Sequence, residues 1–464
     1  MFMIYNTATH QKEAFKPVKE GHVSFYGCGP TIYNYSHIGN MRAFIFYDIL
    51  NRYFRYKGYQ VHFCSNLTDV DDKTIRDSQK AGKTLKEFTG FYGDAFMRDC
   101  AALNIKKPDF VPRATEEIPA MIELVQLLLD KGYAYKAASG DIFYKISKFA
   151  DYGKMAGIEV SQLRANADGR LSDEYEKENA EDFALWKAWT EKDGDNYWDT
   201  PFGRGRPGWS LECSAMARKY LGQPFDIHIG GCDLVFPHHT NEIAQSEAAY
   251  GCTFVNYWMH NAHILMNGKK MSKSLGNFYT VSDLLNKGYS RHALRYELMK
   301  AHYRAELDFR EDNMPGNQAV IDRLVNFMTR LRTEIGGAGW PGAGNAVQGV
   351  LMGFESGLDD DLNMPVAMAA VFDFVSEVNK NFARLGRADA DAIIAAMEKI
   401  NTVLNIIPEA EKKELTSEQQ ALIDKRQAYR AAKDWTSADA VKKQLAEQGI
   451  EVKDTPAGPV WRFV

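Results

Sequence analysis

Residues 23–40 read VSFYGCGPTIYNYSHIGN and combine a short apolar run, a turn and the start of a helix. The apolar run at 23–27 is typical of a buried β-strand, and the glycines and proline behind it are turn signals. Apolar residues then recur at helical spacing over 41–54, until Gly58 ends the pattern. The next apolar run, at 60–66, predicts a second buried strand.

A strand, a helix and a strand of these lengths predict a parallel sheet with a right-handed crossover, which is an α/β arrangement. Ligands of such sheets bind beyond the carboxyl ends of the strands. We therefore expect the functional site among the residues that follow the two strands, 27–40 and 66–73. Farther along, residues 201–281 read as short strands and sharp turns, and a helical period dominates from about Tyr296.

Composition narrows the possible partners and compartments. Lys and Arg number 56 and Asp and Glu 61, a net charge of −5, so a nucleic acid would have to bind a local basic patch. The sequence has no apolar run of membrane-spanning length and no secretory signal at its start, so we expect a cytoplasmic protein without a membrane partner. The six cysteines include no C-x-x-C pair, which favours free thiols or metal ligands over a disulfide framework.

Three segments carry residues suited to chemistry. LMNGKKMSKSLGN (residues 265–277) is a basic loop suited to phosphate oxygens, although such loops are more often solvated turns. His37 and Asn40 stand at the entrance of the first predicted helix, where free N–H groups favour an anion. A histidine in that position is also commonly only a helix cap.

The third segment is FPHHTNEIAQSEAA (residues 236–249), in which His238 and Glu242 are four positions apart. On a helix this spacing presents both side chains to one metal ion, but an exposed polar helix face would show the same pattern. Cys28 and Cys213 are candidate distant ligands. Spacing alone leaves zinc as one possibility.

The order of these segments resembles a known family. An H-x-G-N motif about 230 residues before K-M-S-K-S is similar to the paired signature of class I aminoacyl-tRNA synthetases. Seven segments, in family order over nearly the whole length, resemble the cysteinyl-tRNA synthetase family: YGCGPTIYNYSHIGN, NLTDVDDK, FALWK, RPGWSLECSAMA, GGCDLVFPHHTNEIAQSEA, KKMSKSLGNF and DTPAGPVWR. Ser210 and Thr240 depart from the family pattern, which commonly has a histidine and an acidic residue there.

The resemblance implies a class I synthetase architecture. We expect a Rossmann-like parallel-sheet catalytic domain at 1–295, with an inserted α/β region at about 75–200. A linking region at 296–314 leads to an α-helical bundle on the tRNA side at 315–410. A small C-terminal anticodon-recognition subdomain follows at 411–464.

The resemblance also implies the site residues. Cys28, Cys213, His238 and Glu242 match the positions that bind one Zn²⁺ per chain, which would hold the thiolate of the substrate cysteine. The remaining implied roles are catalysis and ATP binding for His37 and Asn40, a loop over the phosphates for Lys270 and Lys273, contact near the adenosine for Gly231 and Asp233, and the amino-acid pocket for Thr68 and Trp209.

The implied reaction is ATP-dependent cysteinylation of tRNA(Cys) through cysteinyl-AMP, by a monomer, with Mg²⁺ accompanying ATP. One alternative is a zinc-dependent cysteine ligase with a non-tRNA amine acceptor, but the helical end and DTPAGPVWR weigh against it. Another is a non-catalytic RNA-binding relative, which would be expected to lose the loop lysines or the zinc ligands. In the tail, Lys425, Arg426, Arg430 and Lys433 are candidates for a basic face against phosphate, although any one of them is more often plain solvated surface.

Overall fold

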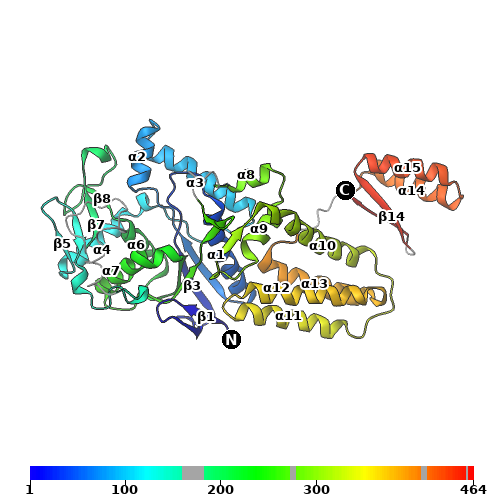
Figure 1. The fold of residues 1–464 in the computed structure, drawn as a ribbon, viewed down its shortest axis with the longest axis horizontal. Helices are drawn as coiled ribbons and strands as arrows, with labels where there is room; N and C mark the ends of the chain where they lie inside the picture. The colour runs from blue at the N-terminus through cyan, green and yellow to red at the C-terminus, as the bar shows by residue number, and fades with distance from the viewer. Residues whose placement is uncertain (159–181, 272–277, 409–414, 456–457, 464) are drawn as a thin grey trace. The chain divides into compact units, whose positions relative to one another are not determined.

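The computed structural model describes residues 1–158, 182–271, 278–408, 415–455 and 458–463 (Figure 1). The chain divides into two compact units. Unit 1 comprises Met1–Asn317 and Ser356–Val366, and unit 2 comprises Gln318–Glu355 and Ala367–Val464. In the described part of the chain, no helix has both the length and the apolar character to cross a membrane.

Unit 1 is built around a parallel sheet in the strand order β10-β9-β3-β4. The strands are β3 (His22–Gly27), β4 (Gln60–Ser65), β9 (Phe225–Gly231) and β10 (Val255–Asn261). Phe25 of β3 pairs with Phe63 on one side and with Ile227 on the other, and all three are buried. The α/β fold predicted from the first strand, helix and strand is confirmed.

The crossover helix α1 (Ile38–Tyr56) forms where the apolar spacing predicts it. Asp48 on its buried face forms an ion pair of 2.6 Å with Arg295, and both side chains are inaccessible to solvent. Arg295 belongs to α9 (Arg291–Met299), so this pair joins two helices of unit 1. Removing one partner of such a pair leaves a buried charge, so the pair restricts how these helices can pack.

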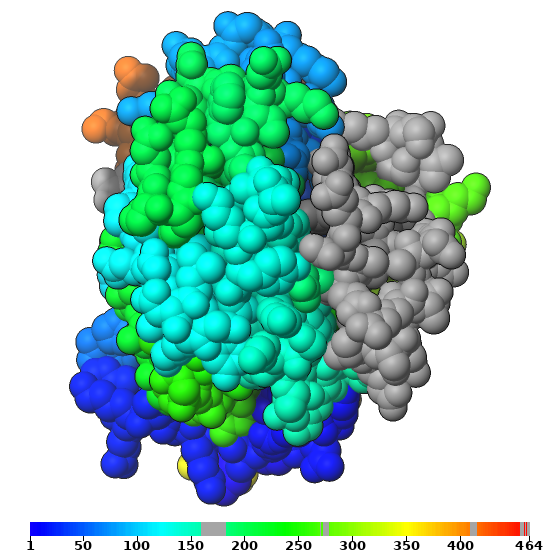
Figure 2. Space-filling model, turned by 90° about the vertical axis from the view of Figure 1, so that its left-hand side faces the viewer, coloured from blue at the N-terminus to red at the C-terminus, as the bar shows by residue number. Residues whose placement is uncertain are grey.

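A large insertion separates β4 from β9. Its four-stranded antiparallel sheet comprises β5 (Ala134–Lys136), β6 (Ile142–Tyr144), β7 (Phe183–Ala188) and β8 (Gly205–Pro207). Its helices include α2 (Asp72–Lys80), α3 (Leu85–Ala102) and α4 (Ile118–Asp130). Figure 2 shows the cyan and green residues of this insertion covering one face of the molecule.

The prediction of strands and turns over 201–281 is partly wrong, because this segment also holds α6 (Trp209–Leu221) and α7 (Thr240–Tyr250). Both helices bury polar side chains, among them Ser214 and Gln245, which are joined by a hydrogen bond. An apolar stripe is the signal by which a helix is recognised, and buried polar residues interrupt it.

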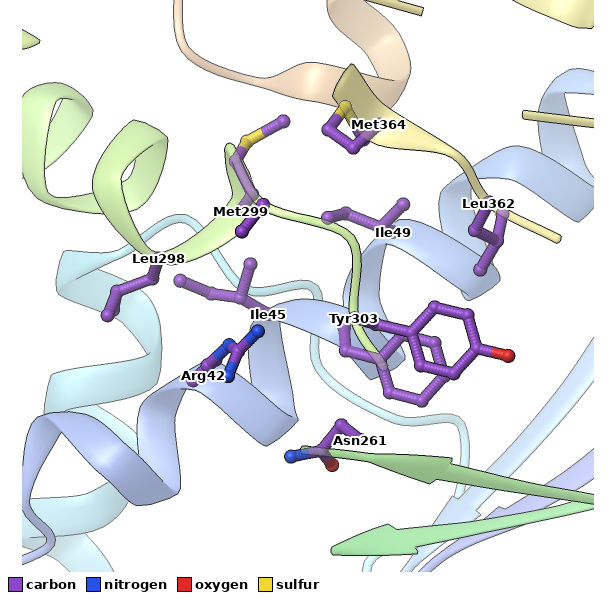
Figure 3. A pocket seen from close by; sticks show the side chains of 11 residues that line it. Arg42, Ile45, Ile49, Asn261, Leu298, Met299, Tyr303, Leu362 and Met364 are labelled. Atoms are coloured by element: carbon purple, nitrogen blue, oxygen red, sulfur yellow. The ribbon is translucent and has the colours of Figure 1, made fainter. Parts of the chain in front are cut away.

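Unit 1 also contains a small three-stranded sheet, in the strand order β12-β11-β13. It contains β11 (Ile264–Met266), β12 (Lys269–Lys270) and β13 (Leu307–Phe309), and α8 (Val281–Asn286) follows β12. Arg42 of α1 donates hydrogen bonds to four carbonyl oxygens around this sheet, those of Ala262, His263, His302 and Ala305. It also lines a small pocket with Ile45, Asn261 and Tyr303 (Figure 3), which contains none of the predicted site residues.

Helices dominate the rest of the chain, as the period from Tyr296 onward predicts. They are α10 (Met314–Thr333), α11 (Ala343–Asp359), α12 (Met364–Lys380) and α13 (Arg387–Leu404). The C-terminal subdomain adds α14 (Ser417–Ala431), α15 (Trp435–Glu447), β14 (Ile450–Thr455) and β15 (Gly458–Phe463). A hairpin of β1 (Met3–Asn6) and β2 (Gln11–Ala14) opens unit 1.

The C-terminal subdomain has its own core, of buried Ile423, Val441, Leu445, Ile450 and Val452. Beside this core, the Arg426 guanidinium donates two hydrogen bonds, of 2.8 and 2.7 Å, to the carboxylate of Asp454. Arg430 lies 3.2 Å from the same carboxylate. The Arg426 side chain is 3% exposed, so its predicted place on a phosphate-binding face is wrong.

This pairing predicts an acid-sensitive subdomain. The hydrogen bonds from Arg426 hold the pKa of Asp454 down to about 2, below the ~3.9 of an unfolded chain. The stabilisation is therefore complete above the unfolded pKa and is lost as the pH falls from about 4 towards 2. In urea titrations at several pH values, the methyl NMR signals of Ile423 and Ile450 should report a midpoint that falls over this range. The Arg426→Met variant should lose most of that pH dependence, and an unchanged dependence would contradict the assignment.

Candidate active site at the carboxyl edge of the parallel sheet

The carboxyl ends of the parallel strands bring distant segments together, as predicted for residues 27–40 and 66–73. The Gly29 N–H donates to Asn66 Oδ1 at 2.9 Å, and Thr31 forms a backbone bridge with Thr68. A Cβ on Gly29 would lie 1.5 Å from the Asn66 carbonyl oxygen, so only glycine permits this approach. Cys28 is thereby held next to β9, where its N–H donates to the Ile229 carbonyl.

The four side chains predicted as metal ligands converge at this edge. Cys28 Sγ lies 3.8 Å from Cys213 Sγ and 3.6 Å from His238 Nε2. His238 Nε2 in turn lies 3.1 Å from Glu242 Oε1. All four residues are buried, and one potential ligand atom from each lies within 4.8 Å of the others.

Packing of α6 on α7 explains this convergence. Cys213 is on the buried face of α6, and Glu242 is in the first turn of α7. Hydrogen bonds from the Gln245 side chain to the Ser210 carbonyl and the Ser214 hydroxyl join the two helices. These buried polar residues obscure the helices in the sequence, and here they align the ligands.

The donor set fits a metal ion. Two thiols, one imidazole and one carboxylate are a combination that Zn²⁺ binds. Glu242 Oε1 is buried and accepts no hydrogen bond from the described residues. If His238 carries its proton on Nδ1, which lies 3.3 Å from the Ser210 hydroxyl, its Nε2 faces that oxygen with a lone pair. A cation between the two atoms would satisfy both.

The electrostatics of the four side chains agree with this reading. Burial lowers the pKa of His238 to about 4 and raises the pKa of Glu242 to about 8. Burial, together with the neighbouring Cys213 thiol, also raises the pKa of Cys28 well above its ordinary value. Burial therefore favours the neutral forms of these groups, and a bound cation would favour the thiolate and carboxylate forms.

Further histidines surround these ligands. His228 Nε2 lies 3.0 Å from Glu242 Oε2, and His239 Nε2 lies 3.3 Å from Cys28 Sγ. Together with Cys28 and Glu242 these two histidines form a second group with metal-ligand spacing. His228 was not predicted as a site residue, because it lies between Ile227 and Ile229 on β9 and resembles a core residue.

The two predicted amino-acid contacts lie beside the cluster. The Thr68 hydroxyl donates to Glu212 at 2.8 Å and accepts from Asn66, whose Oδ1 is 3.9 Å from Cys213 Sγ. The Trp209 ring lies 4.2 Å from the His238 ring and is 38% exposed. Thr68 is therefore a buried neighbour of the four ligands, and Trp209 is a partly exposed neighbour that packs on the His238 ring.

His37 and Asn40 form the helix cap that the sequence allows. The Asn40 N–H donates to His37 Nδ1, and the His37 N–H donates to Asn40 Oδ1. The segment after the Lys/Ser loop runs alongside them, with the Ile38 N–H donating to the Tyr279 carbonyl and the Phe278 ring 5.3 Å from that of His37. The segment that follows the loop thus adjoins the start of α1.

The structure describes three of the four remaining residues that were predicted to contact ATP. Gly231 is the last residue of β9 and Asp233 lies two positions beyond it, and a Cβ on Gly231 would lie 2.4 Å from Asp233 Oδ1. Lys270 ends β12. Lys273 lies outside the described residues.

The sequence matches three family models. Residues 14–319 match the class I (C) tRNA synthetase catalytic domain, 353–409 the DALR domain, and 412–462 the cysteinyl-tRNA ligase anticodon binding domain. Among solved structures, methionyl-tRNA synthetase of Mycobacterium tuberculosis with bound methionyl-adenylate has a TM-score of 0.60 at 16% identity. That match covers 83% of this chain and 90% of that chain, and it shows a shared fold.

Characterised relatives match over the full length. Cysteine–tRNA ligase of Brachyspira hyodysenteriae is 44% identical, with 99% of each chain covered. That of Protochlamydia amoebophila is 45% identical, covering 98% of this chain and 96% of its own. The chain belongs to the cysteine–tRNA ligase family, whose catalytic and anticodon-binding domains it carries in order.

Proposed function

We propose that the chain activates L-cysteine with ATP and transfers the cysteinyl group to tRNA(Cys). The observation that carries this proposal is the convergence of Cys28, Cys213, His238 and Glu242 next to Thr68 and Trp209. A non-tRNA amine acceptor has no support, because residues 412–462 match an anticodon-binding domain.

Cys28, Cys213, His238 and Glu242 would hold one Zn²⁺, which would supply a binding position that favours the thiolate of cysteine over the hydroxyl of serine. Pocket shape alone separates such similar substrates by only about 10- to 200-fold. A soft thiolate is a much better zinc ligand than a hydroxyl, so this donor set adds selectivity that shape cannot supply. Thr68 and Trp209 would border the amino acid on its buried and exposed sides.

The ATP side of the site uses the start of α1. Here His37 and Asn40 would meet the phosphates, Lys270 and Lys273 would reach them from the loop, and Gly231 and Asp233 would lie near the adenosine. Mg²⁺ would accompany ATP. The helix N-terminus and the lysines stabilise negative charge, which is what a phosphoryl transfer requires.

The chemistry then needs no nucleophile from the protein. A carboxylate oxygen of cysteine bonds to the α-phosphorus, the bond to the β-phosphate breaks, and pyrophosphate leaves. The terminal ribose hydroxyl of tRNA next attacks the carbonyl carbon and loses its proton, and AMP leaves. The residues around the substrates act by positioning them and by stabilising charge.

We further propose that the helical region at 315–410 and the C-terminal subdomain at 411–464 serve the tRNA, and that the protein acts as a monomer. The match of 412–462 to an anticodon-binding domain supports the first statement. Membership of the cysteine–tRNA ligase family supports ATP, an amino acid and tRNA as the three binding partners.

The activation step has a direct test. Purified protein should exchange labelled pyrophosphate into ATP when cysteine is present, with a kcat/KM for serine lower by more than the ~200-fold that shape supplies. The assay is run with each amino acid alone and with neither as the blank. Robust exchange with serine and none with cysteine would refute the assignment.

A further inference from the structure

An exposed aromatic cluster lies near the start of α1, outside the proposed zinc and ATP contacts. Tyr35, two residues before His37, is 44% exposed, and Phe91 on α3 is 47% exposed. The Tyr35 ring centroid lies 6.0 Å from that of Phe91 and 5.4 Å from that of Tyr92, and the two α3 rings lie 5.1 Å apart. We call Tyr35, Phe91 and Tyr92 the aromatic platform.

Packing inside unit 1 does not account for the exposed rings. Helix α3 buries Phe88 and Phe96, and Phe96 packs against Phe44 of α1 with a centroid distance of 4.7 Å. The ring centroid of Phe88 lies 5.1 Å from that of Tyr92. The core therefore holds α3 in place through other residues, while Phe91 remains half in solvent. A contiguous group of exposed rings rimmed by charged residues is a surface feature that marks binding sites.

The surroundings of the platform carry charges of both signs, with Glu87 and Asp94 about one turn from Phe91 on α3 and a basic stretch before them. Residues 73–86 contain five Lys or Arg and one Asp, in a chain whose net charge is −5. Within this stretch, Lys83 places its ammonium 5.6 Å from the Phe91 ring centroid, and Lys73 lies 5.8 Å from that of Tyr33. The stretch comprises α2, the turn and the start of α3, which lie side by side in Figure 1.

Aromatic rings interleaved with lysines fit a flexible strand of nucleic acid. Bases stack on exposed rings regardless of sequence, and the lysines contact the backbone phosphates. A paired helix keeps its bases stacked inside and offers no faces to such rings. The platform adjoins the start of α1 through Tyr35, and the proposed reaction needs the terminal ribose of tRNA to reach that place.

We infer that the aromatic platform binds the unpaired 3′ end of the tRNA by base stacking, with Lys83 against its phosphates. This inference rests on the proposed function and adds to it a surface that guides the acceptor end to the adenylate. Tyr35 joins the platform to the catalytic segment, because only Ser36 separates it from His37.

Substitutions at Phe91 test the inference, because this half-exposed ring can be changed without opening the core. Affinity is measured for two probes, full-length tRNA(Cys) and the same transcript trimmed back to its paired acceptor stem. The Phe91→Leu variant should bind the full-length tRNA at least about fivefold more weakly, which is the lower end of one lost stacking contact. It should bind the trimmed tRNA like the parent protein, and Phe91→Tyr should restore full-length binding.

Three outcomes would overturn the inference. Unchanged binding of full-length tRNA by Phe91→Leu would show that no base stacks there. Equal weakening for both probes would place the contact on the paired stem. If Phe91→Leu binds full-length tRNA as tightly as the parent protein and Phe91→Ala does not, the contact requires an apolar side chain and not an aromatic ring. Cysteine-dependent pyrophosphate exchange, measured on the same variants, should stay within about twofold, and its absence in the parent protein would instead count against the proposed function.

Discussion

The Cys213→Ala variant should lose its zinc and most of its ability to activate cysteine, while still binding ATP. The substitution leaves three of four ligands, and even the loss of a group that only orients a ligand costs ~10- to 100-fold in metal affinity. We therefore expect zinc content to fall from about one ion per chain to under a tenth, and kcat/KM for cysteine in exchange to fall by at least ~100-fold. The affinity for ATP should change by less than about threefold, because Cys213 is not among the proposed ATP contacts.

A matched control is available in Cys100→Ala. Cys100 is also a buried thiol on a helix of unit 1, and it belongs to no group with metal-ligand spacing among the described residues. This variant should keep its zinc and its exchange activity. If Cys213→Ala retains the metal content of the parent protein, then Cys213 is not a ligand.

Deleting the residues after 410 should separate the two half-reactions. The C-terminal subdomain has its own core, so its removal leaves the parallel sheet and the four ligands unchanged. Cysteine-dependent exchange should remain within about twofold of the full chain. Charging of tRNA(Cys) should fall by ~100-fold or more in kcat/KM, since losing one of two linked binding modules forfeits the gain in effective concentration.

The second measurement on the truncated protein is tRNA affinity. A rise in Kd that matches the loss in charging would place the defect in binding. Equal losses in exchange and charging would contradict separate roles for the two ends of the chain. The full-length Arg426→Met variant, which alters the subdomain without deleting it, should show a smaller charging defect.

Local periodicity was sufficient to predict the central fold. The strand, turn and helix of residues 22–56 have a regular apolar pattern, and the structure places β3 and α1 there. Helix α6 could not be found in this way, because it buries Ser210 and Ser214 against Gln245 of α7. Polar contacts between two helices leave no apolar stripe, and they are known only once both partners are placed.

The candidate site, too, could be predicted only in part from the sequence. The spacing of His238 and Glu242 indicated one pair of ligands, and the resemblance to a family supplied Cys28 and Cys213, which lie 185 positions apart. Nothing in local sequence indicated His228 or His260, each of which is a histidine in a buried strand. His260 lies 2.7 Å from His239, so this network depends on the register of β9 and β10 and becomes visible only in the folded sheet.

The central claim is that four distant side chains hold one zinc ion that binds the sulfur of the substrate. X-ray absorption at the zinc edge of the purified protein, before and after addition of cysteine without ATP, tests it most directly. We predict two sulfur ligands at about 2.3 Å in the free protein, from Cys28 and Cys213, and three after cysteine is added. An active protein without zinc, or a sulfur count that stays at two in saturating cysteine, would contradict the account.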